Sequence, residues 1–112
     1  MNQEKRIGKI KRIAVGFGGY QDAMLGLTVD LGGHGWGVGD FKGFWGSDIA
    51  HSENCKWTEA SRRDAHADTM LLIGKLLTDA NKTSADELCG VPVEVCFEGN
   101  TLKSWRILTE AI

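Results

Sequence analysis

Residues 23–45 read AMLGLTVDLGGHGWGVGDFKGFW, and their pattern predicts two strands joined by a turn. From Ala23 to Leu31, leucine and valine alternate with smaller or polar residues, which is typical of a strand with one buried face. Gly32-Gly33-His34-Gly35 predicts a turn, and a second alternating strand then runs from Trp36 to Trp45. The stretch therefore predicts an antiparallel hairpin.

The segment before this hairpin predicts one more strand. Residues 7–17 place Ile13, Val15 and Phe17 on one face, and Lys9 and Lys11 continue that face past the edge of the core. The turn expected over 18–22 joins this strand to the hairpin, giving a three-stranded antiparallel meander. Residues 1–6 are polar, and we expect them to be frayed.

The segment after the hairpin predicts a polar loop over 46–56 and then a long amphipathic helix. Thr58 is the expected N-cap and Asn81 the approximate end of the helix, with Arg62 off the apolar stripe. The expected stripe contains Met70, Ile73, Leu76, Leu77 and Ala80, preceded by His66 and Ala67. Such a helix is expected to lie on a sheet.

The last third of the chain predicts a short helix over 83–88 and two strands, over 91–97 and 102–108, joined by a turn. The order β-β-β-α-(short α)-β-β predicts an α+β fold. We expect an antiparallel sheet of about five strands with one long helix packed on one face, in a single domain spanning 1–112. A partly closed barrel plugged by the helix is the alternative, because glycine-rich strands bend easily.

Composition narrows the function classes. The 112 residues are 42% hydrophobic and 25% charged, with a formal net charge of −2, which does not favour a bulk polyanion as partner. The three cysteines lack C-x-x-C spacing, so we expect reduced thiols in a cytoplasmic protein. The N-terminus has no apolar segment typical of a signal peptide, and the run 69–74 is too short to cross a membrane.

Motifs for metal binding and catalysis are weak. Because His34, His51, His66 and Cys55 lack paired ligand spacing, we expect structural or solvent-exposed roles and no metal site. The glycines at 16–19 precede a strand rather than a helix, so a phosphate-binding loop is not expected. The carboxylates near the glycine region, which are candidates for acid–base work, are Asp22, Asp30, Asp40 and Asp48. Turn capping is their expected role, so we predict neither an enzyme nor a cofactor.

A basic cluster near the N-terminus suggests a different function. It contains Lys5, Arg6, Lys9, Lys11 and Arg12. Such a cluster can contact phosphates, and neighbouring aromatics can stack on bases. A solvated strand edge is the alternative, since lysines on edges also block unwanted strand pairing. Nucleic-acid binding through this cluster is therefore kept as the second hypothesis for function.

Aromatic residues on both faces of the strand 36–45 support the first hypothesis, protein binding. Trp36 and Phe44 lie on one face, while Phe41 and Trp45 lie on the other, so they cannot all enter one core. Exposed aromatics are typical of binding surfaces. The candidate partner-binding residues are Tyr20, Asp22, Trp36, Asp40, Phe41 and Trp45. An exposed edge or aromatic face also allows a homodimer, whereas the helix stripe requires none.

Four segments of the chain resemble small proteins encoded by tailed bacteriophages and prophages. They are GFGGYQDA at 16–23, GWGVGDF at 35–41, KWTE at 56–59 and LKSWRILTE at 102–110. The resemblance implies a compact accessory protein in a bacterial cytoplasm, and it carries no catalytic residue over. By analogy with other small phage proteins, we expect binding to a host or phage protein, which includes inhibition of a host defence system or regulation of an enzyme.

Overall fold

The computed structural model describes residues 3–112. Its strands are β1 (Gln3–Gly18), β2 (Met24–Gly33), β3 (Trp36–Trp45), β4 (Pro92–Glu98) and β5 (Thr101–Ile107). One long helix, α1 (Glu59–Ala80), follows β3, and three short 3-10 helices are η1 (Tyr20–Asp22), η2 (Ala85–Leu88) and η3 (Thr109–Ala111). Apart from η1, which lies where a turn was expected, and η3, the element order is the predicted one.

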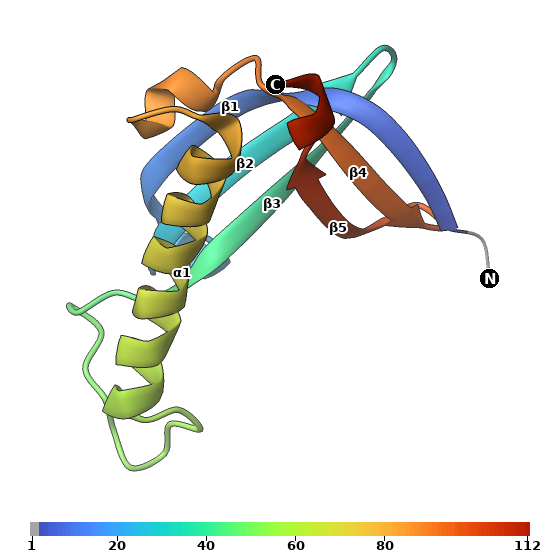
Figure 1. Cartoon of the computed structure of the whole chain (residues 1–112). Helices are drawn as coiled ribbons and strands as arrows, with labels where there is room; N and C mark the ends of the chain where they lie inside the picture. The colour runs from blue at the N-terminus through green and yellow to red at the C-terminus, as the bar shows by residue number, and fades with distance from the viewer. Residues whose placement is uncertain (1–2) are drawn as a thin grey trace.

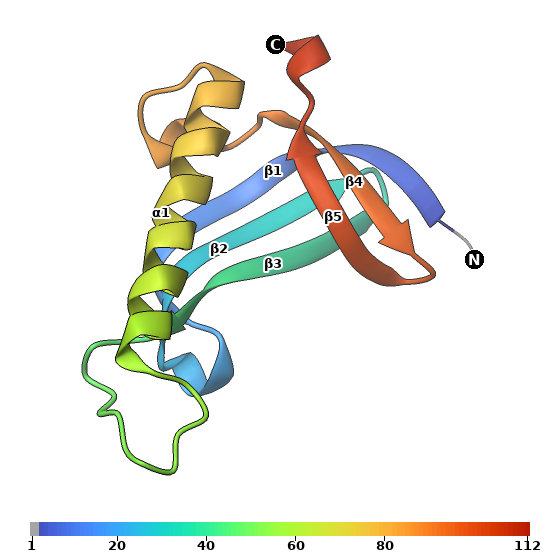
Figure 2. The same cartoon turned by 60° about the horizontal axis from the view of Figure 1, so that its bottom comes forward.

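All five strands form one antiparallel sheet in the order β3-β2-β1-β4-β5. Helix α1 lies as a separate layer on one side of it and crosses in front of β1, β2 and β3 (Figures 1 and 2). The predicted α+β architecture is therefore confirmed. We call the face toward α1 the inner face and the opposite one the outer face.

A β-bulge divides β1 into two halves. The first half pairs with β4 through Lys9 and the second half pairs with β2 from Lys9 onward, with a register shift between Ile10 and Arg12. The extra residue, Lys11, reverses the alternation of side chains. Lys9 is consequently on the outer face while Ile13 is on the inner face, so the prediction that they share a face is wrong.

The N-terminal segment is more ordered than expected. Residues 1–2 lie outside the described part of the chain, so the frayed end predicted for 1–6 is addressed only from Gln3. Gln3 pairs with Glu98, and the ladder continues without a break to Lys9 and Pro92. The polar composition of this segment does not predict a strand. The segment forms one because its backbone groups are hydrogen-bonded to β4.

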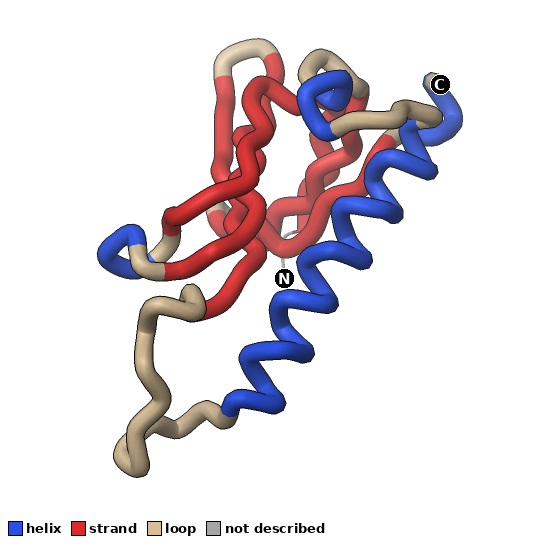
Figure 3. The backbone as a smooth tube through the Cα atoms, turned by 90° about the vertical axis from the view of Figure 1, so that its left-hand side faces the viewer, coloured by secondary structure: helices blue, strands red, loops and turns tan. Residues whose placement is uncertain are grey.

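The core lies between the inner face and α1. Figure 3 shows the backbone of α1 running along one side of the strands. The fully buried side chains include Ile10, Leu27, Leu31, Leu88 and Ile107. They come from β1, β2, η2 and β5, so both halves of the sheet contribute to one core. The predicted in-facing row of β2, which begins at Leu25, is buried from Leu27 to Leu31.

Helix α1 buries the C-terminal part of the expected stripe, since Leu76 and Ala80 are in the core and Ile73 and Leu77 pack against it. Thr58 caps its N-terminus in a reciprocal box with Ser61, as the sequence predicts for Thr58. The buried positions are Arg62, Thr69, Leu76 and Ala80. Met70, expected on the stripe, is 67% exposed, because the apolar run 70–77 wraps around more than one side of the helix. No helix within residues 3–112 has the length and apolarity to cross a membrane.

Side chains on the inner face tie the two ends of the sheet together. The indole of Trp105 on β5 donates a hydrogen bond of 2.8 Å to the carboxylate of Asp40 on β3. Trp36 packs edge-to-face on Phe97 of β4, with 5.6 Å between ring centroids. These contacts curl the two ends of the sheet toward each other. The fold has two layers, as predicted, and shares with the barrel alternative only this curvature of the sheet.

Buried Arg62 organises the loop between β3 and α1. Its guanidinium donates hydrogen bonds of 2.6 Å to the carbonyl oxygens of Gly46 and Ile49, and it pairs with Glu59. It also lies over the Trp57 ring, 4.7 Å from the centroid. The burial of this arginine therefore has a structural cause, which its position on a helical wheel does not reveal.

Candidate functional site

The six candidate partner-binding residues divide between the two faces of the sheet. By strand register, Phe41 and Trp45 are on the outer face, and Trp36 and Asp40 are on the inner face. Tyr20 and Asp22 belong to η1, the connection between β1 and β2. The structure thus groups Tyr20, Phe41 and Trp45 and separates Trp36 and Asp40 from them.

We define the outer aromatic patch as Tyr20, Met24, Phe41 and Trp45. Tyr20 packs edge-to-face on Trp45, with ring centroids 6.2 Å apart, yet Tyr20 remains 65% exposed. Phe41 and Met24 both flank Gly19, since a Cβ there would lie 3.0 Å from Phe41 Cε2 and 3.2 Å from Met24 Sδ. The patch combines exposed and half-buried rings, as binding surfaces do.

A row of glycines beside the patch makes room for the Phe41 ring on the outer face. Gly16, Gly26 and Gly43 are directly opposite one another on three adjacent strands. A Cβ on Gly43 would lie 2.8 Å from Gly26 Cα and 2.9 Å from Phe41 Cζ, too close for any side chain. The Phe41 ring therefore occupies space that a side chain at 43 would take, in the manner of an aromatic covering a strand glycine.

The turn that presents Tyr20 has an unfavourable backbone. Gln21 and Asp22 both have a φ of 53°, in the left-handed region that residues with a Cβ avoid. Asp22 is exposed, and η1 contains no buried residue. Strained backbone is frequent at functional sites, where it holds a side chain in a required position. Here the turn holds Tyr20 against Trp45.

Trp36 and Asp40 have partners inside the fold. The Trp36 ring lies over two glycines, because a Cβ on Gly33 would be 2.5 Å from its Nε1 and one on Gly8 would be 2.8 Å from its Cζ2. Asp40 accepts the Trp105 hydrogen bond described above. Both side chains hold the sheet in shape, so the outer aromatic patch does not include them.

Two apolar residues that the sequence placed toward the core are exposed. Val15 and Phe17 are on the inner face but are 59% and 62% exposed, because α1 packs mainly on β3 and β2. Phe17 reaches across the sheet end to Gly46, where a Cβ would lie 2.9 Å from its Cε1. Alternation assigns a face to a residue but does not show where the helix stops covering it.

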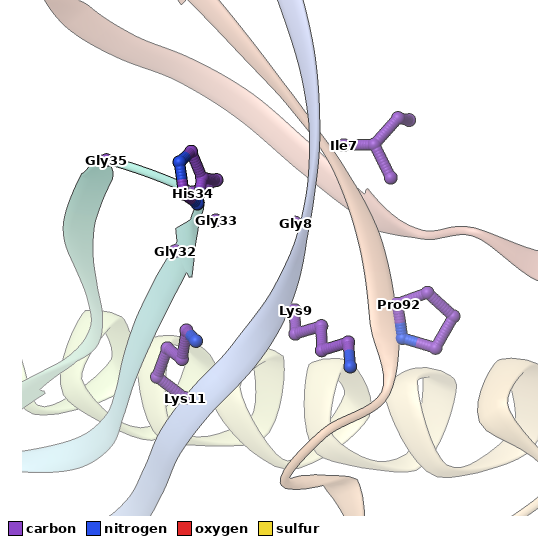
Figure 4. A pocket seen from close by; sticks show the side chains of 9 residues that line it. All are labelled: Ile7, Gly8, Lys9, Lys11, Gly32, Gly33, His34, Gly35 and Pro92. Atoms are coloured by element: carbon purple, nitrogen blue, oxygen red, sulfur yellow. The ribbon is translucent and has the colours of Figure 1, made fainter.

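The basic cluster partly lines a groove on the outer face. This groove of about 560 Å³ lies where β1 bulges, beside the β2–β3 turn, and its lining includes Lys9, Lys11 and His34 (Figure 4). Arg6 and Arg12 differ from the lysines because they pair with Glu4 at 2.9 Å and Asp30 at 3.6 Å. Within residues 3–112, Lys5, Lys9 and Lys11 make no ion pair.

The histidine and cysteine side chains do not converge. His51 is hydrogen-bonded to the Trp57 carbonyl at 2.8 Å, and His66 lies 3.4 Å from the Phe44 carbonyl. Hydrogen bonding from Ser52 lowers the pKa of the Cys55 thiol. Over the described chain, no three His, Cys, Asp or Glu residues are grouped so as to hold a metal ion.

Comparison with known proteins adds no relative to this description. No protein-family model matches the chain, and neither a curated protein nor a solved structure matches it.

Proposed function

We propose that this chain is a non-enzymatic accessory protein of phage or prophage origin that binds a host or phage protein through the outer aromatic patch. The observation that carries the proposal is the exposure of Tyr20, packed on Trp45, on the face that α1 leaves free. The sequence resemblance supports the origin. Inhibition of a host defence system or regulation of an enzyme is the role we assign to the binding.

The chemistry of the patch favours a protein partner. Tyrosine and tryptophan supply large, rigid contact areas and are enriched among the residues that dominate binding energy. The exposed carboxylate of Asp22 next to Tyr20 gives the patch a polar rim.

The test uses the purified chain as bait in bacterial lysate, with quantitative mass spectrometry, followed by calorimetry on each captured protein. We expect Tyr20→Ala to weaken binding by about 2 kcal/mol or more, which is roughly 30-fold. Leu71→Ala is the matched control, because Leu71 is 71% exposed on the far side of α1. If every captured protein bound Tyr20→Ala as tightly as the unmodified chain, the proposal would fail.

Nucleic-acid binding is the second candidate, favoured by lysines beside the outer groove that make no ion pair within the described part of the chain. Phosphate contacts by Lys9 and Lys11 predict binding of single-stranded or duplex DNA that weakens steeply as salt rises. Fluorescence anisotropy across a salt titration tests it. Lys9→Gln/Lys11→Gln is expected to reduce the affinity and Lys75→Gln, which removes a lysine paired with Asp79, is not. Absence of binding at low salt eliminates this candidate.

A further inference from the structure

The second half of β1 has a strand on one side only. β4 pairs with Gln3–Lys9, and the backbone of Ile10 still makes bonds of 3.0 and 2.8 Å with Val91 and Gly90. From Arg12 to Gly18, β2 is the only strand paired with β1 in the described chain. In an antiparallel ladder, alternate N–H and C=O groups of this segment are therefore directed away from β2.

This open edge lacks the usual protection against strand pairing. Residues 12–18 read RIAVGFG, with a single charge at one end and no proline. Natural edges are usually guarded by lysines, prolines, bulges or a covering helix or loop. Here η2 packs against β1, and the chain that follows η2 pairs with Ile10, before the open segment begins. Here the bulge at Lys11 precedes the open segment, and Val15 and Phe17 are exposed within it. The edge therefore has both unpaired backbone groups and uncovered apolar side chains.

We propose that the occupant of this edge is a second copy of the chain, paired antiparallel through residues 12–18 with Val15 facing Val15 of the partner subunit. Directly opposed residues in an antiparallel pair share a face. Ile13 then faces Phe17 of the partner subunit, and the same contact occurs twice by symmetry. All inner-face pairs in this register are apolar.

The charge pattern and the length of the segment select this register. On the outer face, Ala14 faces Gly16 of the partner subunit, and Arg12 faces Gly18 of the partner subunit. The guanidinium therefore meets no like charge and keeps its own partner, Asp30. A pairing centred on Ala14 would set Phe17 against the bulge at Lys11, and one centred on Gly16 would leave Ile13 unpaired. Only the pairing centred on Val15 uses the whole segment.

The dimer has a consequence for the rest of the molecule. It joins the two sheets into one continuous sheet and keeps the two outer faces on the same side. Two copies of the outer aromatic patch would then be available on one surface, so a partner with two sites would bind with increased avidity. The pairing itself does not depend on the function proposed for that patch.

Light scattering across a concentration series tests the pairing. The unmodified chain is expected to reach twice its monomer mass of 12.2 kDa. Val15→Lys and Val15→Glu are each expected to be monomers, because like charges would face each other directly. A mixture of these two variants is expected to recover the dimer, because opposite charges then meet. Leu71→Lys, altered at another exposed apolar residue, on α1, is the control and is expected to remain dimeric.

Each result decides for or against the pairing. A monomeric unmodified chain at every concentration would overturn it and leave the edge for a strand of another protein. Dimers of Val15→Lys alone, or no dimer in the mixture, would overturn the register. Circular dichroism checks that the variants fold. Should they not fold, amide exchange in the unmodified chain replaces them, and protection of residues 13–17 is expected to rise with protein concentration.

Discussion

Asp40 connects β3 to β5 through one hydrogen bond, whose donor, Trp105, lies 65 residues further along the chain. A hydrogen bond to a charged group contributes about 1.5–3 kcal/mol, and Asp40→Ala also leaves the indole N–H without this acceptor. We expect Asp40→Ala to lower the free energy of unfolding in urea by about this amount.

Asp30→Ala is the matched control for Asp40. Within residues 3–112, Asp30 pairs only with Arg12, at 3.6 Å, and both side chains are about half exposed, so the expected loss is below about 1 kcal/mol. Equal losses for the two variants would show that the Asp40–Trp105 bond does not fasten the sheet.

At the scale of residues, the sequence pattern predicts the sheet face on which a side chain lies better than it predicts the residues that the side chain contacts. Alternation correctly separated Trp36 and Asp40 from Phe41 and Trp45, because side chains in a strand have a period of two. It did not find the partners of Trp36 and Asp40, since these belong to strands that the chain reaches much later. For that reason the predicted site combined residues that the structure places on opposite faces.

At the scale of elements, Arg62 joins α1 to the loop after β3 through the carbonyl groups of Gly46 and Ile49. Arg62→Leu would leave both carbonyl oxygens without this donor, so we expect a loss of about 1–3 kcal/mol in unfolding free energy. Amide exchange over 47–58 is expected to accelerate. Arg63→Leu, one position along and exposed, is the control; if it had the same effect, Arg62 would not be the organising residue.

The C-terminal helix η3 is held by an ion pair with a clear pH signature. Two hydrogen bonds of 2.8 Å from Arg106 hold the pKa of the Glu110 carboxyl at about 2, below its ordinary value of 4.5. A lowered pKa means that the pair stabilises the fold above about pH 4.5 and that this contribution is lost as the pH falls through about 2.

An NMR titration of the Glu110 carboxyl measures this effect. The midpoint is expected at about 2 in the unmodified chain and near 4.5 in Arg106→Gln. Lys103→Gln, also on β5, is expected to leave the midpoint at its low value. A midpoint near 4.5 in the unmodified chain would mean that the pair does not form in solution.

The sequence predicted the elements well because their patterns are local. Short stretches of sequence are enough to show the alternation in β2 and β3, the Thr58 cap and the last two strands, β4 and β5. The bulge at Lys11 has no such signature, since a one-residue insertion is recognised only from the partner strand. It moved the lysines to the outer face. The exposed positions of Val15, Phe17 and Met70 likewise depend on how far α1 covers the sheet, which no local pattern specifies.

At the scale of the whole molecule, the two faces of the sheet differ in what their side chains contact. The inner face, with α1, η2 and the Trp36–Phe97 and Asp40–Trp105 contacts, holds the fold together. The outer face presents aromatic side chains next to a glycine row, and we propose that it binds a partner. Substitutions on the two faces should therefore have opposite effects on stability and binding.

Chemical denaturation of Trp36→Ala and Tyr20→Ala, side by side, tests this division most directly. Trp36 packs against Phe97 and over two glycines, so its removal is expected to cost about 3 kcal/mol or more. Tyr20 is 65% exposed, so its removal is expected to cost less than about 1 kcal/mol. A similar loss for both variants, or a larger one for Tyr20→Ala, would contradict the account, because the outer patch would then be part of the core.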